Sequence, residues 1–168
     1  MTIVQDHPRK VLTAGAIAAI LAASTPLVTR WEGEIPATYL DPLKIITACL
    51  GHTDPSLRMG MRFTHGQCMA LLDKDQRAVL RGVDRCTTVD MSPLSYGAFV
   101  SFSFNTGYGV YCDRFAAMVN RGDLAAACRR MGLYVYGRDR VTSKMVKLPG
   151  LVRRRTDEIA LCLKGVGV

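Results

Sequence analysis

Residues 31–53 read WEGEIPATYLDPLKIITACLGHT. In this stretch eight residues separate Glu32 from Asp41, and five separate Asp41 from Thr47. Two carboxyl groups and a hydroxyl suit hydrolysis of a glycosidic bond, because one carboxyl protonates the leaving oxygen while the other activates a water on the opposite face of the sugar. The spacing suits a helix that ends at Glu32 and a short hairpin that returns Asp41 and Thr47 opposite it. The stretch therefore predicts a candidate glycosidase site between a helix end and a small sheet.

Outside this stretch the chain carries helix signals. Strand signals are confined to roughly residues 37–50, where Tyr39, Ile45 and Ile46 favour extended chain and Asp41-Pro42 favours a turn. The expected helix ends are a capping box from Thr64 to Gln67, a start at Ser92-Pro93, caps at Asp113 and Asp123, and a last helix from Gly150 or Leu151 to Lys164-Gly165. The pattern predicts a mainly helical α+β fold, with the site on a small sheet lobe and a helical lobe as the other cleft wall.

Glu32, Asp41 and Thr47, followed by Gly51-His52-Thr53, resemble the catalytic signature of phage-type lysozymes, glycoside hydrolase family 24. Later blocks resemble the same family in the same order, namely FNTG at 104–107, NRGD at 120–123, and PGLVRRR at 149–155 with a glutamate after it. The resemblance implies a two-lobed lysozyme-like fold with a small antiparallel sheet lobe. It also implies a muramidase that cleaves the β-1,4 bond between N-acetylmuramic acid and N-acetylglucosamine in peptidoglycan for host cell lysis, without metal or cofactor.

The resemblance implies a role for each catalytic group. Glu32 is expected to be the general acid, Asp41 the base that activates water, and Thr47 the hydroxyl that holds this water. The family inverts the anomeric centre, and inversion calls for carboxyl groups about 6.5–9.5 Å apart. Glu34 is the rival acid, but the interval to Asp41 favours Glu32.

Further motif residues are expected to line the cleft. Gly51, Asn105 and Arg154 are expected to contact the glycan, although Asn105 also suits packing between the lobes. His52 could be a base, but a buried histidine with structural hydrogen bonds is the favoured interpretation. The sequence departs from the family at Cys49, which replaces the first glycine of the usual Gly-x-Gly-His-Thr, and it lacks a tryptophan often found before the PGLVRRR block.

Length and charge limit the possible functions. The chain has 168 residues, of which 49 % are apolar, enough for one domain with a core and short for two. Its net charge is +8, and residues 129–155 hold nine Lys and Arg against the single acid Asp139. This excess indicates an anionic partner. Because no nucleic-acid motif accompanies it, the peptidoglycan glycan strand of the cell wall is favoured over nucleic acid as the partner. The protein is expected to be a monomer. Two non-enzymatic alternatives remain, a wall-binding module with idle carboxylates and a cationic segment, residues 129–164, that disrupts membranes.

The cysteines indicate the compartment. Cys49, Cys68, Cys86, Cys112, Cys128 and Cys162 are an even number, and none of them has the spacing of a zinc site. Such a set is typical of a domain oxidised outside the cytoplasm. Six cysteines allow 15 disulfide connectivities, and the sequence leaves the choice open.

Residues 11–29 carry no charge and are preceded by Arg9-Lys10 and followed by Arg30. Their number just suffices to span a bilayer as a helix, but their alanine, threonine and serine content makes the segment weakly hydrophobic. Three interpretations compete: a cleaved signal peptide, a permanent anchor, and the signal-arrest-release segment that this region resembles and that one class of phage endolysins carries. The third is favoured, so we expect residues 1–30 to be a weak transmembrane segment and residues 31–168 the catalytic domain.

This interpretation predicts location and regulation. Basic residues before Val11 favour a cytoplasmic amino terminus, so the catalytic domain is expected on the periplasmic side of the host inner membrane and then free in the periplasm. Glu32 lies three residues beyond Thr29. A membrane-held segment would therefore keep Glu32 from its place opposite Asp41, and the tethered enzyme is expected to be silent. The segment contains no cysteine, which favours activation by refolding alone.

Overall fold

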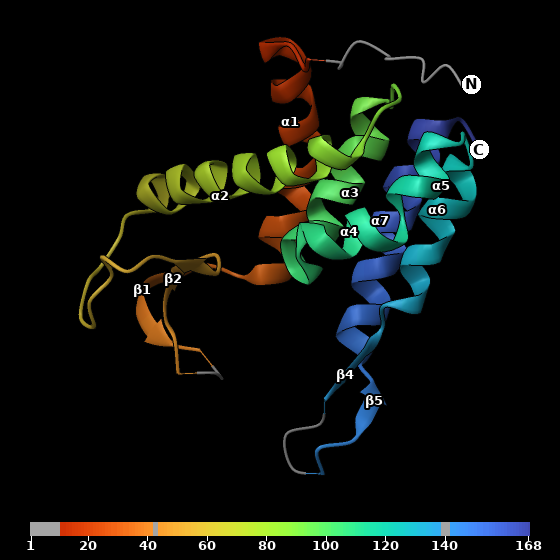
Figure 1. The fold of residues 1–168 in the computed structure, drawn as a ribbon. Helices are drawn as coiled ribbons and strands as arrows, with labels where there is room; N and C mark the ends of the chain where they lie inside the picture. The colour runs from red at the N-terminus through yellow and green to blue at the C-terminus, as the bar shows by residue number, and fades with distance from the viewer. Residues whose placement is uncertain (1–10, 42–43, 139–141) are drawn as a thin grey trace, which may run out of the picture.

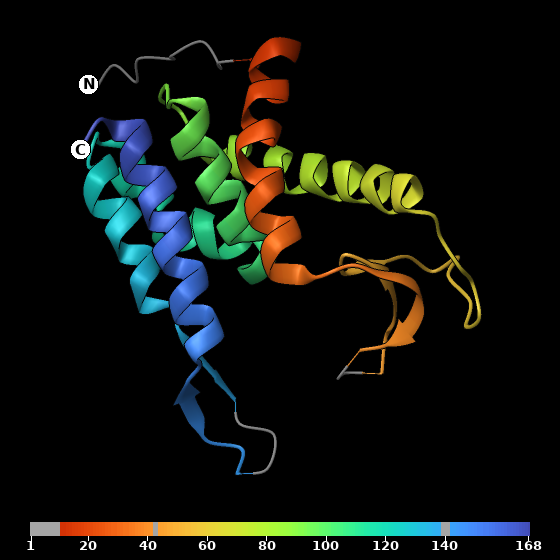
Figure 2. The same ribbon diagram turned by 180° about the vertical axis from the view of Figure 1, so that it is seen from behind.

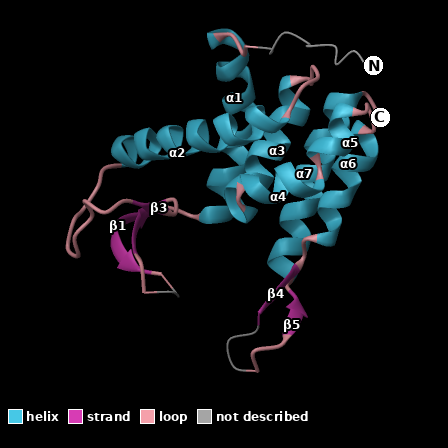
Figure 3. Cartoon of the chain, viewed as in Figure 1, coloured by secondary structure: helices cyan, strands magenta, loops and turns pink. Residues whose placement is uncertain are grey.

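A long helix leads directly into a small antiparallel sheet and packs mainly against one other helix of a bundle (Figure 1). The computed structural model describes residues 11–41, 44–138 and 142–168. Its elements are α1 (Ala14–Glu32), β1 (Ile35–Leu40), β2 (Ile46–Cys49), β3 (His52–Thr53), α2 (His65–Cys86), α3 (Pro93–Thr106), α4 (Tyr108–Arg114), α5 (Ala116–Asn120), α6 (Leu124–Arg130), the 3-10 helix η1 (Met131–Leu133), β4 (Tyr136–Arg138), β5 (Met145–Lys147) and α7 (Pro149–Val166). Figures 2 and 3 show the sheet lobe apart from the bundle of α3 to α7, which confirms the two-lobed, mainly helical α+β prediction.

The first sheet has the strand order β1-β2-β3, and both pairings are antiparallel. Tyr39 lies opposite Thr47, and the backbone N–H of Asp41 donates to the carbonyl of Ile45 at 3.0 Å, which closes the hairpin. A small apolar cluster lies under this sheet, formed by Val28, Ala48, Cys49, Leu50, Leu57, Cys68 and Leu72. The predicted hairpin is confirmed, and its cluster joins the end of α1 to the start of α2.

A second sheet, β4–β5, was not expected, so the prediction that strands are confined to residues 37–50 is wrong. Its strands have three residues each and pair antiparallel, with Tyr136 opposite Lys147. Runs this short carry too little alternation to be recognised, and the charged residues in them resemble loop sequence. The pairing forms here because the chain must return from the bundle to the start of α7.

Most predicted helix ends are confirmed. The Thr64 hydroxyl accepts from the Gln67 N–H at 3.2 Å in a complete capping box, and the Ser92 hydroxyl accepts from Ser95 N–H before Pro93. The last helix spans Pro149–Val166, as expected. The prediction that Asp113 caps a helix is wrong, because Asp113 lies inside α4 and the following helix begins after Phe115. A side-chain oxygen alone does not decide a cap when the neighbouring turn is already helical.

The cysteines form three disulfides, Cys49–Cys68, Cys86–Cys112 and Cys128–Cys162. The first joins β2 to the first turn of α2, the second joins the end of α2 to α4, and the third joins α6 to α7. No described cysteine is left free. The oxidised domain expected from the sequence is therefore observed, and the fold selects one of the 15 connectivities.

Helix α1 packs along α3 and contributes Ile20, Leu21, Ser24 and Val28 to the interior. The helix runs without interruption across residues 30 and 31, where the sequence had suggested a boundary between segment and domain. It is also long and apolar enough to cross a membrane, with a mean hydropathy of 1.2 over its most apolar window. The same helix thus buries one face against α3 and also, marginally, satisfies the demands of a membrane span.

Gly97 on α3 allows the close approach of α1. A Cβ at Gly97 would lie 2.7 Å from the Ala23 Cβ and 2.9 Å from the Ile20 carbonyl oxygen. We therefore expect Gly97→Ala to destabilise the fold by about 1–3 kcal/mol, because the two helices must separate to admit the methyl group. Urea unfolding would measure the change. Gly109→Ala is the matched control, because nothing lies within 4 Å of its Cβ position; equal stability of both variants would contradict tight packing of α1 on α3.

Candidate active site

Glu32 is the last residue of α1, and Gly33, with φ of 71°, turns the chain out of the helix toward β1. The Arg154 guanidinium donates from Nη1 to Glu32 Oε1 at 2.7 Å. The Arg154 side chain is only 4 % exposed, whereas that of Glu32 is 23 % exposed. One carboxylate oxygen of Glu32 is thus fixed from inside the protein while part of the side chain remains open to solvent.

Arg154 belongs to a buried charge network on α7. Its Nε donates to Glu158 Oε1 at 3.1 Å, and Arg155 donates to the other Glu158 oxygen. The Ser101 hydroxyl, from α3, donates to Glu158 Oε1 at 2.9 Å. Arg155 also donates to the Asn105 side-chain oxygen. The network therefore ties α7 to α3 and, through Arg154, to the end of α1.

Burial in this network shifts the pKa values of two of its members. Burial raises the pKa of the Glu158 carboxyl, although both neighbouring arginines act in the opposite direction. Burial likewise lowers the pKa of the Arg155 guanidinium, against the attraction of Glu158. Desolvation is the largest cause in both cases, and buried ion pairs often stabilise a fold no better than apolar residues of similar volume. The network is better explained by orientation, because it fixes the guanidinium that contacts Glu32.

Asp41 and Thr47 lie on the β1–β2 hairpin, as predicted. Asp41 Oδ1 accepts from the Ile45 N–H at 2.8 Å, and the Thr47 hydroxyl donates to the Ile45 carbonyl at 3.1 Å. Thr47 is 4 % exposed, and since its proton is engaged, its remaining lone pairs are what it can offer a water. Burial raises the pKa of Tyr39, and the carboxylates of Glu32 and Asp41 add to the shift. Tyr39 therefore lies within electrostatic reach of both carboxyl groups.

The turn from β2 to β3 brings the sheet lobe up to Glu32. A Cβ on Gly51, which has φ of 87°, would lie 3.9 Å from Glu32 Oε2. Cys49 also has a left-handed φ of 56°, so the cysteine adopts the kind of conformation for which the family uses glycine, and its disulfide to Cys68 holds it there. The arrangement leaves Glu32 Oε1 facing Arg154 and Oε2 facing the turn of the sheet lobe.

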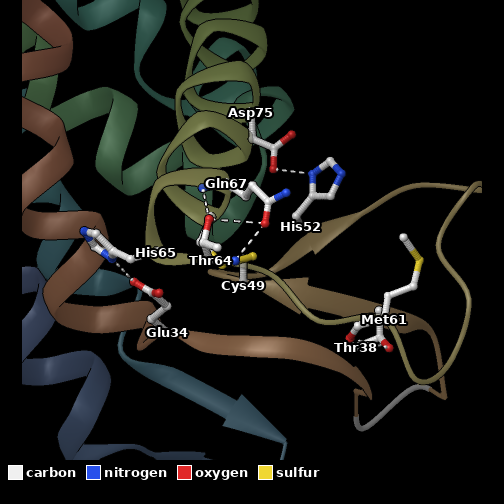
Figure 4. Close-up of a disulfide and its surroundings, with 10 residues drawn as sticks. Glu34, Thr38, Cys49, His52, Met61, Thr64, His65, Gln67 and Asp75 are labelled. Carbon is white, nitrogen blue, oxygen red and sulfur yellow. Dashed lines mark hydrogen bonds and ion pairs between the residues drawn. A yellow bond between two sulfur atoms is a disulfide. The ribbon is translucent and has the colours of Figure 1, made fainter.

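Two other titratable residues near this turn have structural partners (Figure 4). The imidazole of His52 is buried, and its Nδ1 lies 2.7 Å from Asp75 Oδ2 on α2, which confirms the structural interpretation of His52. Glu34, the rival acid, pairs through Oε2 with Nδ1 of the exposed His65 at 2.7 Å. Glu34 therefore contacts the start of α2, whereas Glu32 contacts the buried network of α7.

A pocket of about 300 Å³ lies beside Glu32. Its lining comes from the ends of α1 and α3 and the start of α7, namely Trp31, Glu32, Asn105, Leu148, Gly150, Leu151 and Arg154. The structure thus brings Asn105 and Arg154 together with Glu32, and Gly51 reaches Glu32 from the sheet lobe. Within the described residues, no group of three or more His, Cys, Asp or Glu side chains could hold a metal ion.

Sequence reasoning missed several residues of the site. Glu158 entered only as the glutamate after the PGLVRRR block, although its spacing from Arg154 and Arg155 by four and three residues is the helical spacing of facing side chains. Tyr39 was used only as a strand former, and Ser101 carried no signal because its partner Glu158 is 57 residues away. Long-range pairs of this kind have no local sequence signature.

Known proteins resemble this chain in sequence and in fold. Residues 29–158 match the family described as Phage lysozyme. The chain is 35 % identical over 124 residues to the SAR-endolysin of Escherichia phage Mu, covering 73 % of this chain and 68 % of that protein. It is 30 % identical over 151 residues to the SAR-endolysin of Bacteriophage PS119, covering 89 % and 87 %. The muramidase domain of SpmX from Asticaccaulis excentricus shares the fold, with a TM-score of 0.75 over 92 % of this chain and 99 % of that one at 24 % identity.

Two lobes that meet at a helix-end glutamate, together with these similarities, define a glycoside hydrolase of the lysozyme class. The family match covers most of the chain, from the end of α1 to Glu158 on α7. The chain belongs to the phage lysozyme family.

Proposed function

We propose that the chain is an inverting muramidase that hydrolyses the β-1,4 bond between N-acetylmuramic acid and N-acetylglucosamine in peptidoglycan, and that it lyses host cells as a monomer without a cofactor or nucleic acid. The observation that carries the proposal is the position of Glu32, which is fixed by Arg154 on one side and meets the sheet lobe on the other. Family membership and the SAR-endolysin names of the relatives support it.

The geometry suggests how the acid works. Oε1 of Glu32 accepts from Arg154, so the proton for the leaving oxygen is assigned to Oε2, which faces Gly51 across the gap between the lobes. Asp41 would activate a water on the opposite face of the sugar, with Thr47 accepting a hydrogen bond from this water. Asp41 directly follows β1 and Thr47 lies in β2 of the same hairpin, whose backbone hydrogen bonds fix their spacing.

Product analysis tests the proposal. Purified peptidoglycan would be incubated with the full chain, and the new reducing ends would be identified by borohydride reduction and mass spectrometry. Reducing ends at N-acetylmuramic acid are expected. Release of peptides without new reducing ends would overturn the proposal, and so would binding of the wall without any product.

We also propose that α1 is held in the inner membrane, with its amino terminus in the cytoplasm, before it packs on α3 and the enzyme becomes periplasmic. The helix passes the length and hydropathy requirements of a span only marginally, as release would require. Glu32 is its last residue, so a membrane-embedded α1 would separate the acid from Arg154 and from the sheet lobe. The tethered form is therefore expected to be inactive.

Cell fractionation tests this second proposal. The chain expressed in a Gram-negative host should first sediment with the inner membrane and later appear in the soluble periplasmic fraction, uncleaved. Lytic activity per molecule should be confined to the soluble fraction. Equal activity in the two fractions, or a soluble form shortened at its amino terminus, would contradict release by refolding.

A further inference from the structure

The β4–β5 hairpin has one face that the described part of the chain leaves uncovered. Tyr136 pairs with Lys147 and Arg138 pairs with Met145, so these four side chains project from the same side of the two strands. Tyr136 is 55 % exposed and Met145 is 60 % exposed. We call Tyr136, Arg138, Met145 and Lys147 the hairpin face.

The opposite side of the hairpin is packed against its own connection. A Cβ on Gly137 would lie 2.6 Å from Leu148 Cδ1, and Val146 is half-buried. Leu148 therefore covers this side of the hairpin and leaves the hairpin face exposed. Figures 1 and 2 show the hairpin projecting from the bundle where α7 begins.

The hairpin face is basic. Arg138 donates from Nη1 to the Ser143 carbonyl at 2.8 Å, and neither Arg138 nor Lys147 forms an ion pair with a described carboxylate. Lys147 and Arg153 border a pocket of about 360 Å³, together with Pro149 and Val152. Cations without an ion-pair partner among the described residues are suited to an anionic ligand, and two of these cations, Lys147 and Arg153, lie at a concave surface.

The hairpin borders the active site on its other side, which Leu148 covers. Leu148 directly follows Lys147 and lines the pocket that contains Glu32. The first residue after β5 therefore already lines the catalytic pocket. A polymer that extends from the Glu32 pocket past Leu148 would reach Lys147 of this hairpin.

We propose that the hairpin face binds peptidoglycan outside the catalytic pocket. Arg138 and Lys147 pair with carboxylates of the peptides attached to N-acetylmuramic acid, and Tyr136 packs against a sugar ring. The inference rests on the proposed function, because it assumes that peptidoglycan occupies the Glu32 pocket. A lipid surface fits less well, since one aromatic ring and one methionine between two cations offer little apolar area for insertion.

Binding without turnover tests the proposal. In a Glu32→Gln background, Arg138→Gln and Lys147→Gln together would be compared with Arg114→Gln and Lys164→Gln, which remove two exposed cations from other helix ends. Co-sedimentation would use intact sacculi and glycan strands stripped of peptides by an amidase. We expect the hairpin variant to bind sacculi about tenfold more weakly and stripped glycan almost unchanged, with the difference vanishing in high salt. The control should bind both ligands like the parent.

Several results would overturn the proposal. Equal loss on both ligands would show that the cations do not recognise peptides, and unchanged binding to sacculi would show that they contribute nothing. Loss of binding to vesicles of phosphatidylethanolamine and phosphatidylglycerol, with sacculi unaffected, would assign the face to a membrane. Failure of the catalytic proposal remains distinguishable, because it appears as missing reducing ends in the product assay whatever the hairpin variant does.

Discussion

Glu32→Gln is expected to lower turnover on purified peptidoglycan by roughly 10²–10⁴-fold, the usual contribution of a general acid. The amide retains the shape of the side chain and can still accept from Arg154, so the fold should be preserved. What the variant loses is the proton that Oε2 would deliver to the leaving oxygen. The measurement is the rate of reducing-end formation, with thermal unfolding as a check that the variant is folded.

Glu34→Gln is the matched control for this experiment. Glu34 is two residues away and makes the same change of charge, but it pairs with the exposed His65 and has no contact with the α7 network. Its activity should stay within about twofold of the parent, because exposed ion pairs contribute little. Loss of activity in Glu34→Gln with retention in Glu32→Gln would move the acid to Glu34 and leave the Arg154 contact without a catalytic meaning.

Glu158→Gln is expected to destabilise the fold by about 3–5 kcal/mol, since it leaves two buried guanidinium groups without their shared carboxylate. Glu158 is fully buried between Arg154 and Arg155. Chemical denaturation at neutral pH would measure the change. Asp157→Asn, the neighbouring control, breaks an ion pair with Arg30, whose side chain is 66 % exposed, and should cost less than about 1 kcal/mol. Similar losses in both variants would contradict the special role of the buried network.

A triple variant separates orientation from stability. Arg154→Met, Arg155→Leu and Glu158→Leu together replace the network by apolar side chains, and stability should recover much of the loss seen in Glu158→Gln. Activity should remain low, because Glu32 no longer has the guanidinium that fixes Oε1. Recovery of both stability and activity would show that the network serves packing alone.

Under the proposed release from the membrane, the N-terminal helix would link this site to regulation. Ala23 and Ser24 of α1 lie against Gly97 of α3, and small side chains such as theirs also keep the segment weakly hydrophobic. Ala23, for example, allows the close approach of Gly97 and also lowers the gain from membrane insertion. A helix suited to both surroundings carries the catalytic acid at its end, so its location would decide whether the site is assembled.

Local sequence was sufficient to predict those structural features that depend on neighbouring residues. The capping box at Thr64, the proline at the start of α3 and the hairpin around Asp41 were predicted, because caps and turns depend on residues within a few positions. Spacing and family resemblance also gave Glu32, Asp41 and Thr47 as a group. The strands β4 and β5 escaped prediction, since strands of three residues form only when a partner strand is supplied.

The sequence by itself determined the fold class, the oxidised state and the candidate catalytic residues, because periodicity, cysteine number and motif spacing are properties of the chain. Only the tertiary structure decided the disulfide connectivity, the contact of Arg154 with Glu32, and the side of the hairpin that faces outward. Each of these depends on residues far apart in the chain, such as the 122 positions between Glu32 and Arg154. Their meeting follows from how the helices pack, and that packing is set by the whole interior rather than by any one segment.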